Sequence, residues 1–104
     1  MSGGTFDYKQ YNITMIADEI ETELDRQGKE KPKSELWMSK EYYEQYPEEK
    51  FWSVHPAEVQ SEMRNAVKIL RQAAVYAHRV DWYLAGDDGS ESFIERLKED
   101  LSKI

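Results

Sequence analysis

Residues 56–85, PAEVQSEMRNAVKILRQAAVYAHRVDWYLA, decide the fold because they predict one long helix. Pro56 suits the first position of a helix, and Gly86 directly follows the stretch, where helices commonly end. Neither Gly nor Pro interrupts residues 57–85, and at about 1.5 Å per residue the rod is about 45 Å long. The sequence therefore predicts a long central helix over about 56–85.

Two shorter helices flank this rod. On the N-terminal side the apolar side chains recur with helical spacing at Ile13, Ile16, Ala17, Ile20 and Leu24. After the turn GDDGS, a second apolar face is formed by Phe93, Ile94, Leu97, Leu101 and Ile104. The alternation typical of strands does not appear. The predicted fold class is all-α, a small helical domain with one long central helix and a shorter N-terminal and C-terminal helix.

The 104 residues fit a single domain over residues 1–104. We expect residues 1–6 to form a flexible N-terminus and residues 29–55 to form an aromatic-rich connection. A connection of this length without structure is unusual in a small domain, so we expect it to pack over the core.

Composition excludes several classes of function. The chain has no Cys, which rules out disulfides and thiolate chemistry. Two His are too few for a multinuclear metal site, and we expect no metal and no cofactor. The net charge of −7 disfavours binding to nucleic acid or to anionic membranes. With no signal-peptide pattern and no long apolar window, we expect a cytoplasmic protein.

The long helix carries a basic stripe. Residues 63–80 contain no Asp or Glu, although the chain has 21 acidic residues. At about 100° per residue, one stripe of roughly 100° contains Arg64, Lys68, Arg71, His78, Arg79 and Trp82. One interpretation is a face that forms salt bridges with the acidic helices of the chain. The other is a site for an anion such as a nucleotide, with Trp82 as a stacking surface.

The opposite side of the long helix is apolar. A heptad-type seam runs through Ile69, Ala73, Tyr76, Val80 and Tyr83, and a second seam shares Ala73 and Val80 and adds Ala66, Leu70, Ala77 and Leu84. Two seams need two sets of partners. We therefore predict a homo-oligomer in which the long helix packs against a copy of itself, at an interface formed by the first seam. The alternative is that residues 36–54 cover the second seam.

Asp81 falls on the apolar arc, where a carboxylate needs a partner. We expect Arg96 or a Tyr hydroxyl to supply it, as a structural lock between helices. Glu41 and Glu44 match only the first half of the carboxylate pairs by which all-α pyrophosphatases hold Mg²⁺. We therefore predict no catalytic residues and no enzyme, with a metal-dependent nucleotide hydrolase ranked last.

Two stretches resemble a known group of proteins. They are GGTFDYKQYNITMIADEIE near the start and RVDWYLAGDDGSESFIERL near the end. They resemble a family of small uncharacterised proteins from bacteria, their phages and mobile elements. The resemblance implies a phage-borne, anti-defence setting in which small proteins act by binding. The expected function is non-enzymatic binding or sequestration of a host protein or signal. The alternative is an oligomer that binds a small anionic nucleotide through the basic stripe.

Overall fold

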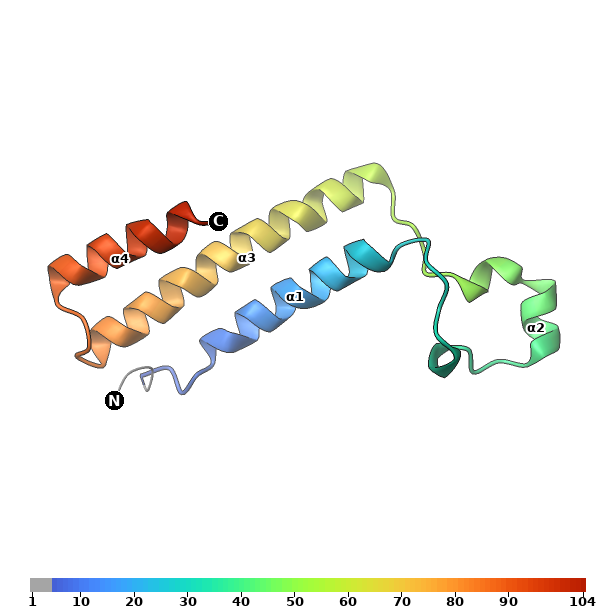
Figure 1. Ribbon diagram of the computed structural model, residues 1–104, viewed down its shortest axis with the longest axis horizontal. Coiled ribbons are helices and arrows are strands. Elements are labelled where there is room, and N and C mark those ends of the chain that lie inside the picture. The colour runs from blue at the N-terminus through green and yellow to red at the C-terminus, as the bar shows by residue number, and fades with distance from the viewer. Residues whose placement is uncertain (1–4) are drawn as a thin grey trace.

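The computed structural model describes residues 5–104 and is built from helices (Figure 1). The α-helices are α1 (Gln10–Arg26), α2 (Lys40–Gln45), α3 (Ala57–Leu84) and α4 (Ser90–Ser102). Two short 3-10 turns, Lys33–Glu35 and Pro47–Lys50, flank α2. The predicted all-α fold with a long central helix is confirmed, and α3 begins and ends within one residue of the predicted bounds. Between residues 5 and 104, no helix is long and apolar enough to cross a membrane.

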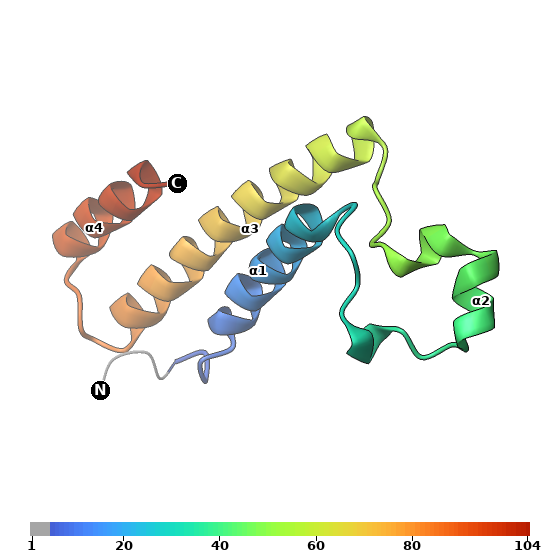
Figure 2. The same cartoon turned by 45° about the vertical axis from the view of Figure 1, so that its right-hand side comes forward.

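The three longest helices form a flat layer. Helices α1 and α4 lie on opposite sides of α3 and, within the described residues, do not contact each other (Figures 1 and 2). The molecule measures 63 × 28 × 14 Å, so its thinnest dimension is little more than one helix diameter of about 10–12 Å. The radius of gyration is 19.8 Å, whereas a compact domain of this length has about 13 Å.

A flat layer leaves little room for a core. In the described part of the chain, the buried apolar residues are Ala17 of α1, Val67 of α3 and Tyr43 of α2. The accessible surface is 7618 Å², about a quarter more than the roughly 6,100 Å² expected for a compact monomer of this mass. Much apolar surface that a globular domain would bury therefore remains exposed.

Glycines end α1 and α3. Gly28 follows the last residues of α1 with φ of 73°, and Gly86 follows α3 with φ of 89°. Residues with a side chain rarely adopt this left-handed conformation, which turns the chain sharply after a helix. The turn at Gly86 sends the chain back along α3 as α4.

Residues 29–55 form a separate arm beyond the end of the α1–α3 pair (Figure 1). The neck of the arm is a short antiparallel pairing. Gly28 N donates to Trp52 O at 2.9 Å, Trp52 N to Lys29 O at 2.9 Å, and Lys31 N to Lys50 O at 2.7 Å. The guanidinium of Arg26 lies 3.9 Å from the ring centroid of Trp52. Neither α2 nor the 3-10 turns contact α3, so the arm does not cover the second seam as the alternative expected.

Candidate functional site

Part of the basic stripe of α3 lines a groove between α1 and α4. The groove has a volume of about 450 Å³. It is lined by Gln10, Tyr11 and Thr14 of α1, by Arg71, Ala74, Val75 and His78 of α3, and by Asp100 and Ile104 of α4. Of the six residues predicted for an anion site, only Arg71 and His78 line this groove. The α1 and α4 residues were missed because the periodicity of one helix does not say which helices flank it.

Arg71 joins α3 to α1. Its Nη2 lies 2.9 Å from Oδ1 of Asp18 and 2.8 Å from Oε1 of Glu21. Hydrogen bonds to Asp18 and then to Glu21 raise the pKa of Arg71. An anion in the groove would compete with these two carboxylates for the same guanidinium.

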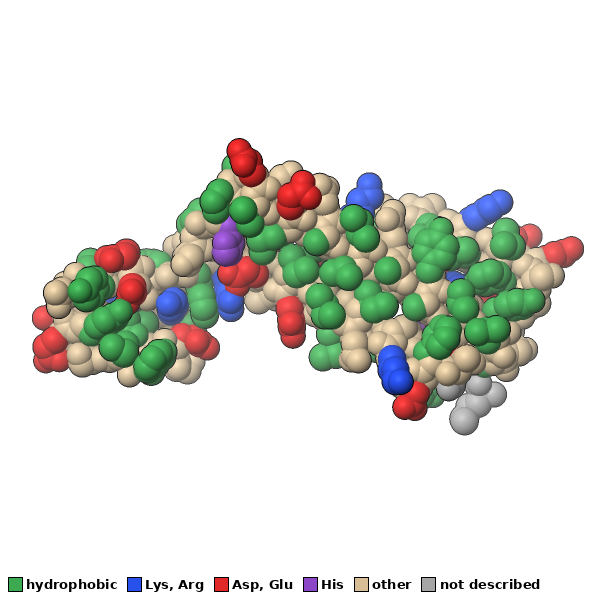
Figure 3. Space-filling view, turned by 180° about the vertical axis from the view of Figure 1, so that it is seen from behind, with side chains coloured by type: hydrophobic (Ala, Val, Ile, Leu, Met, Phe, Trp, Pro, Cys, Tyr) green, Lys and Arg blue, Asp and Glu red, His purple; other side chains and the backbone are tan. Residues whose placement is uncertain are grey.

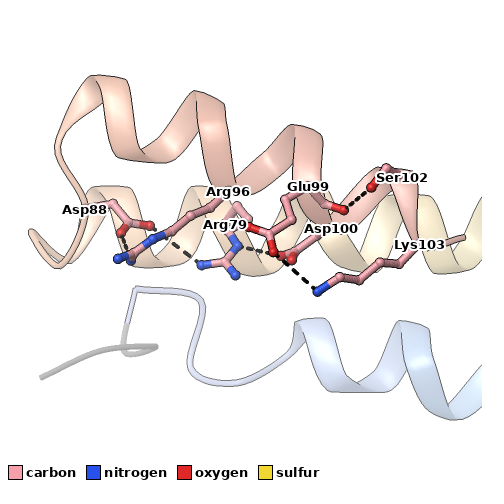
Figure 4. Close-up of polar contacts among 7 residues, drawn as sticks. All are labelled: Arg79, Asp88, Arg96, Glu99, Asp100, Ser102 and Lys103. Atoms are coloured by element: carbon pink, nitrogen blue, oxygen red, sulfur yellow. Dashed lines mark hydrogen bonds and ion pairs between the residues drawn. The ribbon is translucent and has the colours of Figure 1, made fainter.

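Arg79 joins α3 to α4 (Figure 4). Its Nε lies 2.7 Å from Oδ2 of Asp100, and its Nη1 lies 3.9 Å from Oδ2 of Asp88. The hydrogen bond from Arg79 holds the pKa of Asp100 below its ordinary value. Asp88, whose side chain is fully buried, also pairs with Arg96 of α4. The Arg79 guanidinium is therefore committed to two carboxylates of the same chain.

The other stripe residues divide into two groups. The ring centroids of Trp82 and His78 are 5.0 Å apart. The guanidinium of Arg79 lies 5.6 Å from the ring centroid of Trp82. Arg64 and Lys68 are exposed, and Arg64 donates a hydrogen bond to Gln60 of the preceding turn. The contacts of Arg71 and Arg79 are those expected of the salt-bridged interpretation.

Asp81 is fully buried, as its position on the apolar arc predicts. Its partners differ from the prediction. The carboxylate accepts hydrogen bonds from Phe6 N at 3.0 Å and from Nε2 of Gln10 at 3.1 Å. The prediction of Arg96 was wrong, because that side chain pairs with Asp88. Asp81 therefore fastens the segment before α1 to the end of α3.

The hydroxyl of Thr5 also donates to the backbone oxygen of Asp81, at 3.4 Å. Residues 1–4 of the predicted flexible N-terminus lie outside the described residues. Residues 5 and 6, the rest of that segment, are attached to α3 through Asp81.

We call the face of α3 opposite the groove the apolar back face, formed by Ile69, Ala73, Tyr76, Val80 and Tyr83. Ile69 is 62% exposed, Tyr76 49% and Tyr83 40%. Tyr83 stacks on Phe93 of α4 at 5.3 Å between ring centroids. Figure 3 shows hydrophobic side chains gathered along this side of the layer, with charged side chains mostly toward its edges. The predicted interface residues therefore lie together on a surface that this chain leaves largely uncovered.

Among residues 5–104, no group of three or more His, Cys, Asp or Glu side chains is arranged to hold a metal ion. Glu41 and Glu44 lie on α2 in the arm and are exposed. No family model, curated protein or solved structure matches this chain.

Proposed function

We propose that this chain is a non-catalytic binding protein that works as a homo-oligomer, in which the apolar back face of one copy packs on that of a second. The observation behind the proposal is this uncovered face, together with the very few apolar side chains that are buried among residues 5–104. Exposed apolar stripes of this extent mark interfaces.

The surface area fits a second copy. The accessible surface exceeds that of a compact monomer by roughly a quarter, or about 1,500 Å². A stable protein interface removes about 800 Å² or more from each partner. Packing two back faces together would bring the exposed surface of each chain toward the ordinary value.

The pattern of the face also fits a copy of the same helix. Its residues repeat at intervals of four, three, four and three, the spacing at which side chains of two helices interlock. A two-fold axis through this face would pair it with itself, as in most homodimers. The face runs from residue 69 to residue 83 of α3, which gives such a contact a length of about 20 Å.

A non-catalytic role agrees with the contacts of the charged side chains near the centre of the layer. Arg71, Arg79, Asp81 and Asp88 each have a structural partner within the chain. The resemblance to phage and mobile-element proteins adds the expected setting. There the oligomer would hold a host defence protein or signal in a stoichiometric complex, inside the bacterial cytoplasm.

The proposed interface is tested by adding charge to it. We expect the double substitution Ile69→Glu with Tyr76→Glu to reduce the mass in sedimentation equilibrium to that of one chain, because two carboxylates would face their copies in an apolar contact. The control is Ser61→Glu with Arg64→Gln, which lowers the net charge by the same amount at exposed positions of α3 outside the back face. Equal masses for both double variants would contradict the proposal.

The second candidate is a binder of a small anionic nucleotide. The observation that favours it is the groove, where Arg71 and His78 lie beside the ring of Tyr11, whose centroid is 6.5 Å from that of His78. A ligand at a hundred times its dissociation constant would stabilise the fold by about 2.7 kcal/mol. Thermal melting with a panel of linear and cyclic nucleotides tests this candidate, and an unchanged midpoint across the panel would remove it.

A further inference from the structure

The arm contains a second concave surface, away from the stripe and the back face. It has a volume of about 550 Å³. Its walls include the aromatic rings of Trp37, Tyr42 and Phe51 and the carboxylates of Glu35, Glu48 and Glu49. We call this the arm pocket. It combines the two kinds of group that attract a cation, aromatic faces and carboxylates.

The pocket is built on a small ordered centre. Tyr43 is buried, and its hydroxyl accepts a hydrogen bond from Met38 N at 3.4 Å. The rings of Tyr42 and Tyr43 meet edge to face at 5.4 Å between centroids. A hydrogen bond to Glu49 raises the pKa of Tyr42 to about 12. The ring of Tyr42 is thus held against the buried Tyr43 before any ligand binds.

The charges around the pocket are unbalanced. Within the described residues, Glu35, Glu48 and Glu49 form no ion pair with a basic side chain. Lys31 also lines the pocket, and its Nζ lies 5.3 Å from the ring centroid of Trp52. The three carboxylates outnumber the single ammonium group, so the lining has an excess of negative charge that would attract a cation from a ligand.

The rim of the pocket suits a macromolecular partner. Trp37 is 83% exposed, which is unusual for the largest apolar side chain. Exposed Trp and Tyr side chains are typical anchors of protein interfaces. The arm also projects away from the helical layer, so a partner reaches it without obstruction from α1, α3 or α4 (Figure 2).

We propose that the arm pocket binds an arginine or lysine side chain from an exposed basic segment of a partner protein. The cationic group would lie against Trp37 and Tyr42 and pair with Glu35 and Glu49. This inference rests on the proposed function, since it names the surface with which a binding protein would hold its target.

The test uses the full-length protein and a fluorescein-labelled peptide of alternating Arg and Gly, followed by fluorescence anisotropy at physiological salt. Binding should weaken about tenfold or more in Trp37→Ala and in Glu35→Gln with Glu49→Gln, as expected when an interface anchor is lost. The matched control is Glu58→Gln with Glu62→Gln, two exposed carboxylates at the start of α3. The control should bind within about twofold of the unaltered protein.

Three results would overturn the inference. They are no binding of the Arg peptide at millimolar concentration, equal weakening by the control pair, or equal binding of a peptide with Glu in place of Arg. Because Trp37 is mostly exposed, its replacement should not unfold the protein, and circular dichroism checks this. Sedimentation of the same samples separates the two proposals. If the protein is a multimer that binds the Arg and the Glu peptides equally, only the proposal for the pocket is rejected. If it is a monomer that still binds the Arg peptide in preference, only the proposal for the assembly is rejected.

Discussion

At the residue scale, the ionisable side chains of the layer mainly form ion pairs and hydrogen bonds that connect its helices. Arg71 joins α3 to α1, Arg79 joins α3 to α4, and Asp81 holds the backbone that precedes α1. Helical projection predicted the stripe and the burial of Asp81, because both follow from positions on one helix. The partners could not be predicted, because they depend on how distant segments pack.

The first prediction concerns Asp81. Replacing it with Ala would leave Phe6 N and Nε2 of Gln10 without their acceptor, so we expect a loss of about 2–3 kcal/mol in the free energy of unfolding. Urea denaturation measures it. The control is Asp87→Ala, an exposed position nearby, which should change stability by less than about 0.5 kcal/mol. Equal effects of the two substitutions would show that the hydrogen bonds to the buried carboxylate do not stabilise the fold.

The second prediction concerns acid. The pKa of Asp100 is lowered in the folded protein by Arg79, so its contribution is complete above the ordinary carboxyl value of 3.8 and is lost as the pH falls through the folded value. Asp100→Asn should therefore be less stable than the unaltered protein at pH 7, by about 1 kcal/mol for this partly exposed pair. The difference should shrink progressively below about pH 4.

Urea denaturation between pH 7 and pH 2 measures this difference. Glu99→Gln is the control, because the Glu99–Lys103 pair is more than two-thirds exposed on both sides and should contribute little at any pH. A stability difference for Asp100→Asn that grows as the pH falls would contradict the assignment.

At the element scale, the helices were predictable and the direction of the arm was not. The 3.6-residue periodicity and the glycines at 28 and 86 locate α1, α3 and α4. The arm has no such period. Its aromatic residues suggested a lid over the core, yet the neck between Gly28 and Trp52 directs them away from α3. Backbone pairing of one short segment decides this direction, and side-chain hydrophobicity carries no information about it.

The third prediction tests that neck. Trp52→Ala removes the ring beneath Arg26, so the amide protons of Gly28 and Lys31 should exchange faster with solvent by about tenfold or more. Amides in the middle of α3 should keep their rates. The matched control is Trp37→Ala, which removes an exposed ring from the same arm and should leave the neck unchanged. Unchanged neck rates in Trp52→Ala would mean that the backbone pairing is sufficient without the ring.

At the scale of the whole molecule, the helical layer is thin and long, and it buries few apolar side chains. The all-α class followed from sequence, but the flatness did not. Helical periodicity shows how much apolar surface a helix presents and does not show how much of it the chain will cover. Because the radius of gyration is 19.8 Å and the back face is open, we propose that a second copy covers this face.

The most direct test of that claim is native mass spectrometry of protein purified from cells, at micromolar concentration. We expect a mass that is a multiple of the 12.3 kDa chain, and the variant Ile69→Glu with Tyr76→Glu should have the mass of a single chain. An additional few hundred daltons on the multimer would identify a bound nucleotide-sized ligand and favour the second candidate. A bare mass of 12.3 kDa for the unaltered protein would contradict the assembly through the back face of α3.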